Sequence, residues 1–316
     1  MKKLFFSISV AITLAFISVL IINNYSPHAI ETNKLFKGFY EQEFNEKEEK
    51  IFLVGSSYVG VLNSEYILKK TLDNNNLKIY NLSVEADHPS RRISQIDDLI
   101  STKPDLVIYG VGLSDLLSYE NIQKTDPILP EPKYYLDTFI QNNFGNIPQQ
   151  FMLSKFILFK NIGLILNLDD NIMEYGGTTS PFINNTKFNH ISNTEELEKN
   201  AILLTKNMPY LPHPESNYEY SELKKILQKF HNADIPVIIF SPPIHPTLSN
   251  LMDTQVKQNY DLILTDVGEE FNYSVYRLEN EYSELDIWHS SDHISTSKTV
   301  TNYNEDIIKI INFTRN

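Results

Sequence analysis

The 316-residue chain contains no cysteine. This absence excludes disulfide bonds, thiolate metal sites, a cysteine nucleophile and a lipidated N-terminal cysteine. Positive charge is also scarce, because 27 Lys and Arg residues face 40 Asp and Glu residues. The resulting net charge of −13 argues against nucleic acid as a partner. With only 10 glycines, the chain has no phosphate-holding glycine loop, and it has no metal-ligand spacing. We therefore expect no metal and no other cofactor.

Long apolar runs are rare, and the longest lies at the N-terminus. Residues 4–22 form 19 positions without a charge, preceded by Lys2 and Lys3. This length approaches the ~20 residues that span a bilayer as a helix. No small-x-small cleavage site follows. We predict an uncleaved anchor at residues 1–25, a single transmembrane helix, and then a polar linker at 26–48. The two lysines place the remainder outside the cytoplasm; if the segment is cleaved, the protein is secreted.

From residue 49 onward, short apolar segments alternate with amphipathic ones. The segments predicted as strands are 50–54, 77–81, 105–110, 235–240 and 273–278. Residues 249–270 are predicted as a helix. Such alternation is typical of an α/β domain with a parallel sheet and helices on both faces. The carboxyl ends of all the strands would then meet at one edge.

An insertion at 116–215 interrupts this domain, which we assign to 49–316. The insertion contains an apolar and aromatic stretch at 151–166. This stretch is predicted as a helix on the domain core, a lid over the site, or a segment lying on the membrane.

Two serines follow the first predicted strand, in the stretch Gly55-Ser56-Ser57-Tyr58. A nucleophilic serine needs an exposed hydroxyl group, a base and nearby N–H donors for the oxyanion. A strand-to-helix turn supplies the exposure and the donors. Alternatively, both serines only cap the next helix.

Polar residues also follow three later strands and precede the final helix. These stretches read NLSVEAD at 81–87, GLSD at 112–115, SPPIH at 241–245 and DIWHSSDHIS at 286–295. In this order they resemble the SGNH hydrolase family, also called GDSL-like esterases, and specifically its membrane-anchored members. The resemblance covers residues 50–115 and 218–313. It implies a three-layer α/β/α sandwich around a flavodoxin-like, five-stranded parallel sheet.

The resemblance also assigns roles to residues in the stretches that begin at Gly55, Asn81 and Gly112. Ser57 matches the family's nucleophile, and its N–H matches one oxyanion donor. Ala86 stands where the family usually has a glycine donor, and its main-chain N–H survives that change. Ser114 stands where an asparagine is usual; a serine hydroxyl group can also donate, but it is shorter and rotates.

The base is ambiguous because two histidines compete. Asp286-x-x-His289 has the spacing of the family motif. His293, followed by Ile-Ser and an amphipathic helix, fits the surrounding family context better, and we favour it. Ser290 would then stand where the orienting aspartate is usual, so Asp286 or Asp292 would have to orient the imidazole.

Three further residues are candidates for binding substrate. Arg91 and Arg92 open the helix after the second strand and could bind a carboxylate or phosphate, or could pair with Asp87 or Glu85. His245 follows the fourth strand and is either a turn residue or a substrate contact.

The resemblance implies acyl transfer on esters. Anchored relatives modify cell-surface polymers, so an acylated, most simply acetylated, surface glycan is the expected substrate of this esterase or O-acyltransferase. Two alternatives remain open. One is a catalytically degenerate glycan-binding protein, suggested by Ala86, Ser114 and Ser290. The other is a lipid-active hydrolase, suggested by the apolar stretch at 151–166.

Overall fold

The computed structural model describes residues 36, 38–71, 76–117, 179–183, 185–207 and 210–315. The described residues from 38 onward belong to one compact unit. The predicted anchor at 1–25 and the apolar stretch at 151–166 lie outside the described residues, as does most of the insertion. Within the described ranges, every helix is too short or too polar to cross a membrane.

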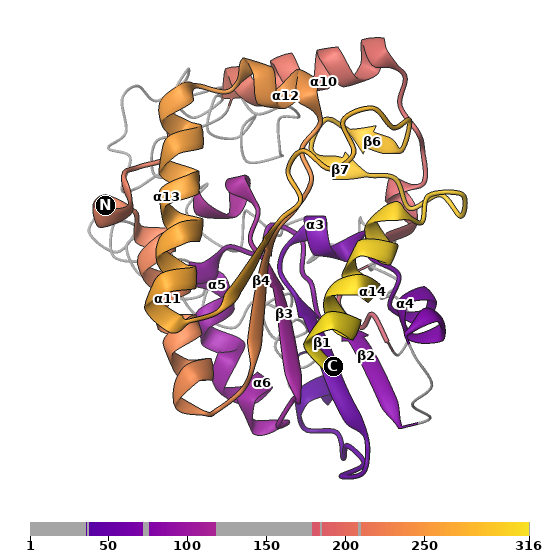
Figure 1. Cartoon of the computed structure of the whole chain (residues 1–316), viewed down its shortest axis with the longest axis vertical. Helices are drawn as coiled ribbons and strands as arrows, with labels where there is room; N and C mark the ends of the chain where they lie inside the picture. The colour runs from indigo at the N-terminus through magenta and orange to yellow at the C-terminus, as the bar shows by residue number, and fades with distance from the viewer. Residues whose placement is uncertain are drawn as a thin grey trace, which may run out of the picture. The chain divides into compact units, whose positions relative to one another are not determined.

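A five-stranded parallel sheet forms the centre of the unit, in the order β2-β1-β3-β4-β5 (Figure 1). The strands are β1 (Glu49–Val54), β2 (Leu77–Asn81), β3 (Leu106–Gly110), β4 (Val237–Ser241) and β5 (Ser274–Arg277). Every residue of β3 and β4 is buried, as expected for central strands covered on both faces. The edge strand β2 instead alternates between buried and half-buried residues. The predicted parallel, five-stranded sheet is confirmed.

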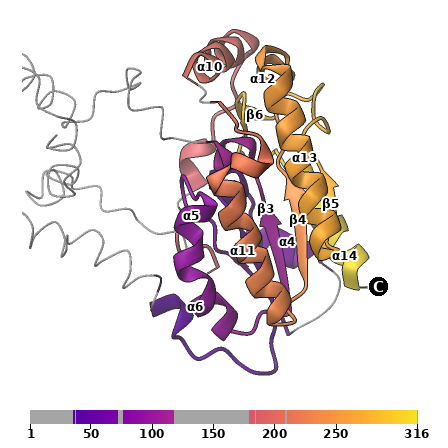
Figure 2. The same cartoon turned by 90° about the vertical axis from the view of Figure 1, so that its left-hand side faces the viewer.

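Helices cover both faces of the sheet, which gives three layers (Figures 1 and 2). On one face α4 (Ser64–Lys70) packs against α14 (Asn302–Arg315). On the other face α11 (Tyr218–Asn232) contacts its neighbours on both sides. These neighbours are α5 (Pro89–Arg92), η1 (Ile93–Gln95), α6 (Ile96–Ser101) and α13 (Thr254–Phe271).

The apolar stripe of α11 explains why it packs there. Leu223, Ile226, Leu227 and Phe230 are all buried. Their spacing of i, i+3, i+4 and i+7 places them on one side of a helix. The residue before the helix, Asn217, is its N-cap, and its side chain accepts a hydrogen bond from the Tyr220 N–H.

Two features differ from the sequence prediction. The helical region predicted at 249–270 is two helices, α12 (Pro246–Leu251) and α13, because Met252 and Asp253 adopt extended backbone angles between them. A small antiparallel pair, β6 (Trp288–Ser290) and β7 (His293–Ile294), was not predicted. Its two or three residues per strand are too few for a periodic pattern.

One part of the described insertion lies beside this small pair. It contains η6 (Asn185–Phe188) and α10 (Thr194–Asn207), and α10 contacts both α12 and β6. The Ser192 N–H donates to the carbonyl of Trp288 at 2.8 Å. The insertion thus supports the segment that carries both candidate histidines.

Candidate active site

The turn after β1 is shaped by a glycine that no other residue can replace without strain. Gly55 has φ = +148°, and a Cβ atom there would lie 2.5 Å from Cγ2 of Val59 and 2.6 Å from the carbonyl oxygen of Gly110. The chain therefore passes close to β3 and enters α3 (Ser57–Gly60) directly. Ser57 becomes the first helical residue at the carboxyl edge of the sheet.

A buried asparagine at the end of β2 holds this turn in place. The side-chain amide of Asn81 donates to the carbonyl oxygens of Val59 and Leu62, at 2.9 and 3.0 Å. Its oxygen accepts hydrogen bonds from the N–H and hydroxyl groups of Ser83. Both the NH₂ group and the oxygen of this amide are hydrogen-bonded, so Asn81 can position the turn without leaving a buried polar group unpaired.

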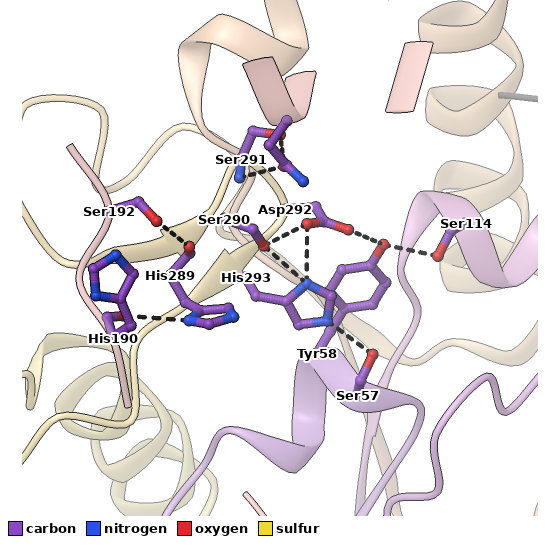
Figure 3. Close-up of polar contacts among 11 residues, drawn as sticks. Ser57, Tyr58, Ser114, His190, Ser192, His289, Ser290, Ser291, Asp292 and His293 are labelled. Carbon is purple, nitrogen blue, oxygen red and sulfur yellow. Dashed lines mark hydrogen bonds and ion pairs between the residues drawn. The ribbon is translucent and has the colours of Figure 1, made fainter. Parts of the chain in front are cut away.

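The hydroxyl group of Ser57 points to His293 rather than to the backbone of its helix. Its Oγ lies 2.8 Å from Nε2 of the imidazole (Figure 3). Ser56 occupies the N-cap position, and its side chain makes no capping hydrogen bond. The alternative that both serines serve as caps does not fit this arrangement.

Asp292 contacts the other ring nitrogen of His293. Its Oδ1 lies 3.0 Å from Nδ1, and the same oxygen accepts a hydrogen bond of 2.7 Å from the Ser290 hydroxyl. Burial alone would raise the pKa of Asp292, but the charge of His293 and these hydrogen bonds hold it below its usual value. Asp292 is therefore an anion that fixes the Nδ1–H tautomer and leaves Nε2 free to accept a proton.

The structure separates the two candidate histidines. His289 Nδ1 lies 3.3 Å from the carbonyl oxygen of His190, and the His289 carbonyl accepts a hydrogen bond from Ser192 (Figure 3). Burial lowers the pKa of His289. Asp286 is exposed, and the ion pair to His293 comes from Asp292 instead. The spacing of Asp286 and His289 therefore does not produce a pair at Ser57.

The two proposed oxyanion positions have different surroundings. Ala86 has φ = +49°, a left-handed conformation that favours glycine over alanine. Ser114 lies on η2 (Leu113–Leu116), and its Oγ lies 2.7 Å from the hydroxyl group of Tyr58. The Ser114 hydroxyl is thus already engaged by a neighbouring side chain.

Of the two alternatives for Arg92, the structure shows pairing with Asp87 and contradicts substrate binding. Arg92 is fully buried, forms an ion pair with buried Asp87, and donates to the carbonyl oxygen of Leu82 at 2.9 Å. A guanidinium group without any solvent exposure cannot contact a substrate. Arg91 is exposed and donates to the main-chain oxygen of Glu85 at 3.1 Å.

His245 is the N-cap residue of α12. Its Nδ1 accepts a hydrogen bond of 3.2 Å from the Thr247 N–H at the start of α12. Its ring packs edge-on against Trp288, with 5.1 Å between the ring centroids. Burial lowers its pKa, which favours the neutral form that can accept this bond. A substrate contact by His245 gains no support from these neighbours.

Two aromatic residues at the site were missed by sequence reasoning. The imidazole of His293 is stacked between Tyr58, at a centroid distance of 4.7 Å, and Phe188, at 5.0 Å. Tyr58 follows Ser57 directly, so its position was a signal that could have been used. Phe188 comes from the insertion, and nothing in its local sequence indicates this contact.

The described insertion also fixes the loop between β6 and β7. The side-chain oxygen of Asn200 on α10 accepts hydrogen bonds from the N–H and hydroxyl groups of Ser291, at 2.9 and 2.5 Å. These bonds are one and two residues away from Asp292 and His293. Among the described residues, no group of three His, Asp or Glu side chains could hold a metal ion.

Asp115 is a buried carboxyl group next to the site. It is 4% exposed, and its Oδ2 accepts a hydrogen bond of 2.8 Å from the Gly112 N–H. Burial raises the pKa of Asp115 to about 8, although the hydrogen bond from Gly112 acts in the opposite direction. Asp115 therefore carries its proton at neutral pH.

The Asp115→Asn substitution is expected to flatten the pH dependence of stability. In the unfolded chain this carboxyl titrates at about 4, whereas in the folded chain it keeps its proton up to about 8. Between these values the folded state binds one proton more. The free energy of unfolding therefore falls with rising pH, by at most about 1.4 kcal/mol per pH unit from this group. Denaturant unfolding from about pH 5 to 7 should give a shallower fall for Asp115→Asn than for the wild type.

Asparagine retains an acceptor for the Gly112 N–H, so the variant removes the titration and keeps the hydrogen bond. The exposed substitution Asp286→Asn serves as the control and should keep the wild-type slope. An identical slope in wild type and Asp115→Asn would contradict the prediction.

Comparisons with known proteins add only a distant likeness. No protein-family model matches the sequence, and no curated protein matches it. The fold is similar to a proposed acylhydrolase from Bacteroides fragilis, with 9% identity, a TM-score of 0.42, and coverage of 89% of this chain and 96% of that one. The acetyl xylan esterase AlAXEase has 11% identity and a TM-score of 0.41, with 83% and 97% covered. An extracellular lipase from Streptomyces rimosus has 7% identity and a TM-score of 0.39, with 83% and 99% covered. At these TM-scores the interpretation of the site rests on its own geometry.

Proposed function

We propose that this protein is a serine esterase or O-acyltransferase that acts on acyl esters, most simply acetyl esters, of cell-surface glycans. The single observation that carries the proposal is the chain of contacts from Ser57 Oγ through His293 to Asp292, at 2.8 and 3.0 Å. A hydroxyl group, a base and an anion in this order form the arrangement that activates a serine.

In the proposed reaction, Ser57 Oγ attacks the carbonyl carbon of the ester while Nε2 of His293 takes its proton. Asp292 stabilises the imidazolium ion that forms. The N–H groups of Ser57 and Ala86 and the hydroxyl group of Ser114 donate to the oxyanion. The intermediate then collapses, the C–O bond to the alcohol breaks, and His293 returns the proton to the departing oxygen.

The acyl group is then held as an ester on Ser57. Water or a sugar hydroxyl group attacks this ester, with His293 again taking the proton, and Ser57 is regenerated. Water as the acceptor makes the protein an esterase, and a sugar makes it an O-acyltransferase. We place this site outside the cytoplasm, attached to a membrane through residues 1–25, on the strength of the apolar run and the preceding lysines.

A fluorophosphonate probe tests the proposal, because it reacts only with an activated serine. The full-length protein should be labelled, and peptide mass spectrometry should find the label on Ser57. Labelling should be lost in Ser57→Ala and kept in Ser56→Ala, the matched control at the neighbouring serine. A folded wild type that is not labelled would overturn the proposal and favour a glycan-binding protein without catalysis. Faster turnover of long-chain than of acetyl esters would favour the lipid-active alternative.

A further inference from the structure

The hydroxyl group of Tyr58 connects the two sides of the site. It lies 2.7 Å from Ser114 Oγ on the oxyanion side and 3.4 Å from Oδ2 of Asp292 on the base side (Figure 3). The first distance is that of a good O–H···O hydrogen bond, and the second is that of a weak one. Of these two contacts, the one with Ser114 is the stronger.

The ring of Tyr58 is fixed as firmly as its hydroxyl group. It stacks on the imidazole of His293 at an angle of 21°, and Phe188 stacks on the opposite face at 11°. The ring also lies against Gly112, where a Cβ atom would come within 2.4 Å of it. Any side chain larger than a hydrogen atom at position 112 would displace the ring. Gly112 and the imidazole of His293 therefore determine where the hydroxyl group of Tyr58 lies.

We propose that Tyr58 is a positioning residue that makes Ser114 an effective oxyanion donor in place of an asparagine. A free serine hydroxyl group rotates, and the time it spends pointing at an oxyanion is limited. A hydrogen bond from a rigid phenol removes most of that freedom. The inference deepens the proposed function and depends on it.

The direction of the hydrogen bonds explains how this would work. Tyr58 has one hydroxyl proton. If it donates that proton to Asp292, its oxygen accepts from Ser114, and Ser114 has no proton left for an oxyanion. If it donates to Ser114 instead, the Ser114 proton is free for the oxyanion. The second arrangement loses only the weak 3.4 Å contact between Tyr58 and Asp292. It gains a hydrogen bond from the Ser114 hydroxyl group to the negatively charged oxyanion, which is stronger than a bond to a neutral acceptor.

A double-mutant cycle on the full-length protein tests this inference, with p-nitrophenyl acetate as the substrate. Tyr58→Phe removes the hydroxyl group and keeps the stacked ring. We expect it to lower kcat by about 10- to 100-fold with KM nearly unchanged, which is less than the loss of about 10²–10³ for an absent oxyanion donor. Ser114→Ala should lower kcat by at least as much. Because Tyr58 acts through Ser114, the double variant should be no slower than Ser114→Ala alone.

The matched control is Phe188→Leu, on the opposite face of the same imidazole. It has no hydroxyl group to lose, so its effect should multiply with that of Ser114→Ala. A merely structural role of Tyr58 would lower the thermal midpoint and would give multiplicative effects in both cycles. Multiplicative effects of Tyr58→Phe and Ser114→Ala, or a Tyr58→Phe variant with wild-type kcat, would overturn the inference while leaving the proposed function intact. A wild type with neither esterase activity nor labelling of Ser57 would instead overturn the proposed function.

A rescue variant makes the test independent of how well the single variants fold. In Tyr58→Phe/Ser114→Asn the space of the phenol oxygen becomes available to an amide, which is a rigid donor by itself. This double variant should recover most of the kcat lost in Tyr58→Phe/Ser114→Ala. A double variant that is folded but equally slow would count against the role assigned to the hydroxyl pair.

Discussion

Replacing His293 with alanine is expected to lower kcat for p-nitrophenyl acetate by about 10⁴–10⁶-fold. The reason is that Nε2 of His293 is the base within hydrogen-bond distance of Ser57 Oγ, at 2.8 Å. Without it the serine stays protonated and the leaving alcohol receives no proton. Steady-state kinetics of the full-length variant would measure the loss.

His289→Ala is the matched control for this prediction. His289 is hydrogen-bonded to the main chain of His190 and makes no contact with Ser57 among its described interactions, so kcat should stay within about threefold of the wild type. Free imidazole should also restore part of the activity of His293→Ala, because the variant leaves a planar space between Tyr58 and Phe188. A large loss in His289→Ala together with a small one in His293→Ala would reverse the assignment.

The Asp292→Asn substitution is expected to lower kcat by about 10²–10⁴-fold while leaving KM nearly unchanged. An amide can present its NH₂ group to Nδ1 of His293, which then accepts, so the ring proton moves to Nε2. In that tautomer the imidazole cannot take the proton of Ser57. In the wild type, His293 and Ser290 hold the pKa of Asp292 below its usual value against the effect of burial, so the carboxyl group is an anion. The amide of the variant lacks this charge.

The control for Asp292 is Asp286→Asn, at the position that the family spacing favours. Asp286 is exposed, so this variant should keep kcat within about twofold. Thermal unfolding of both variants would separate a loss of catalysis from a loss of folded protein. Equal activity of Asp292→Asn and wild type would show that the imidazole needs no carboxylate in this protein.

Both predictions concern a loop whose position depends on the insertion. Phe188 stacks on the imidazole, and Asn200 holds the backbone and hydroxyl groups of Ser291 between the two small strands. Such contacts leave the loop few other conformations. The described part of the insertion therefore contributes to the site as directly as the strand ends do.

Much of the fold could be predicted from local sequence alone. β3 and β4 are short apolar runs, each bounded by polar or turn residues, and burial on both faces requires that composition. The stripe on α11 follows from its helical period. The turn at Gly55 was predicted to expose a serine, and Ser57 does reach a histidine there. Each of these features is encoded within about ten to fifteen neighbouring residues, which is the range over which periodicity carries information.

The composition of the site was decided by tertiary structure. Ser57 and His293 are 236 positions apart, and two histidines only four residues apart could not be told apart by spacing. The short antiparallel pair β6 and β7, with its irregular register, determines which of them faces the serine. The side chain of Arg92 is of a type that binds anionic ligands, but its burial beside Asp87 makes it part of the core.

By itself the sequence determined the alternation of strands and helices and the serine at the carboxyl end of the first strand, because both depend on near neighbours. The parallel sheet could be predicted from that alternation, although its strands pair residues that are far apart in the chain. Only the tertiary structure decided that Asp292 orients His293, that Tyr58 and Phe188 enclose the imidazole, and that Tyr58 engages Ser114. Most of these contacts join segments that are far apart in the chain, and the contact between the adjacent residues Asp292 and His293 depends on the irregular pairing of β6 and β7. The geometry of all of them depends on how the helices and the insertion pack around the sheet. No pattern within one segment can encode that packing.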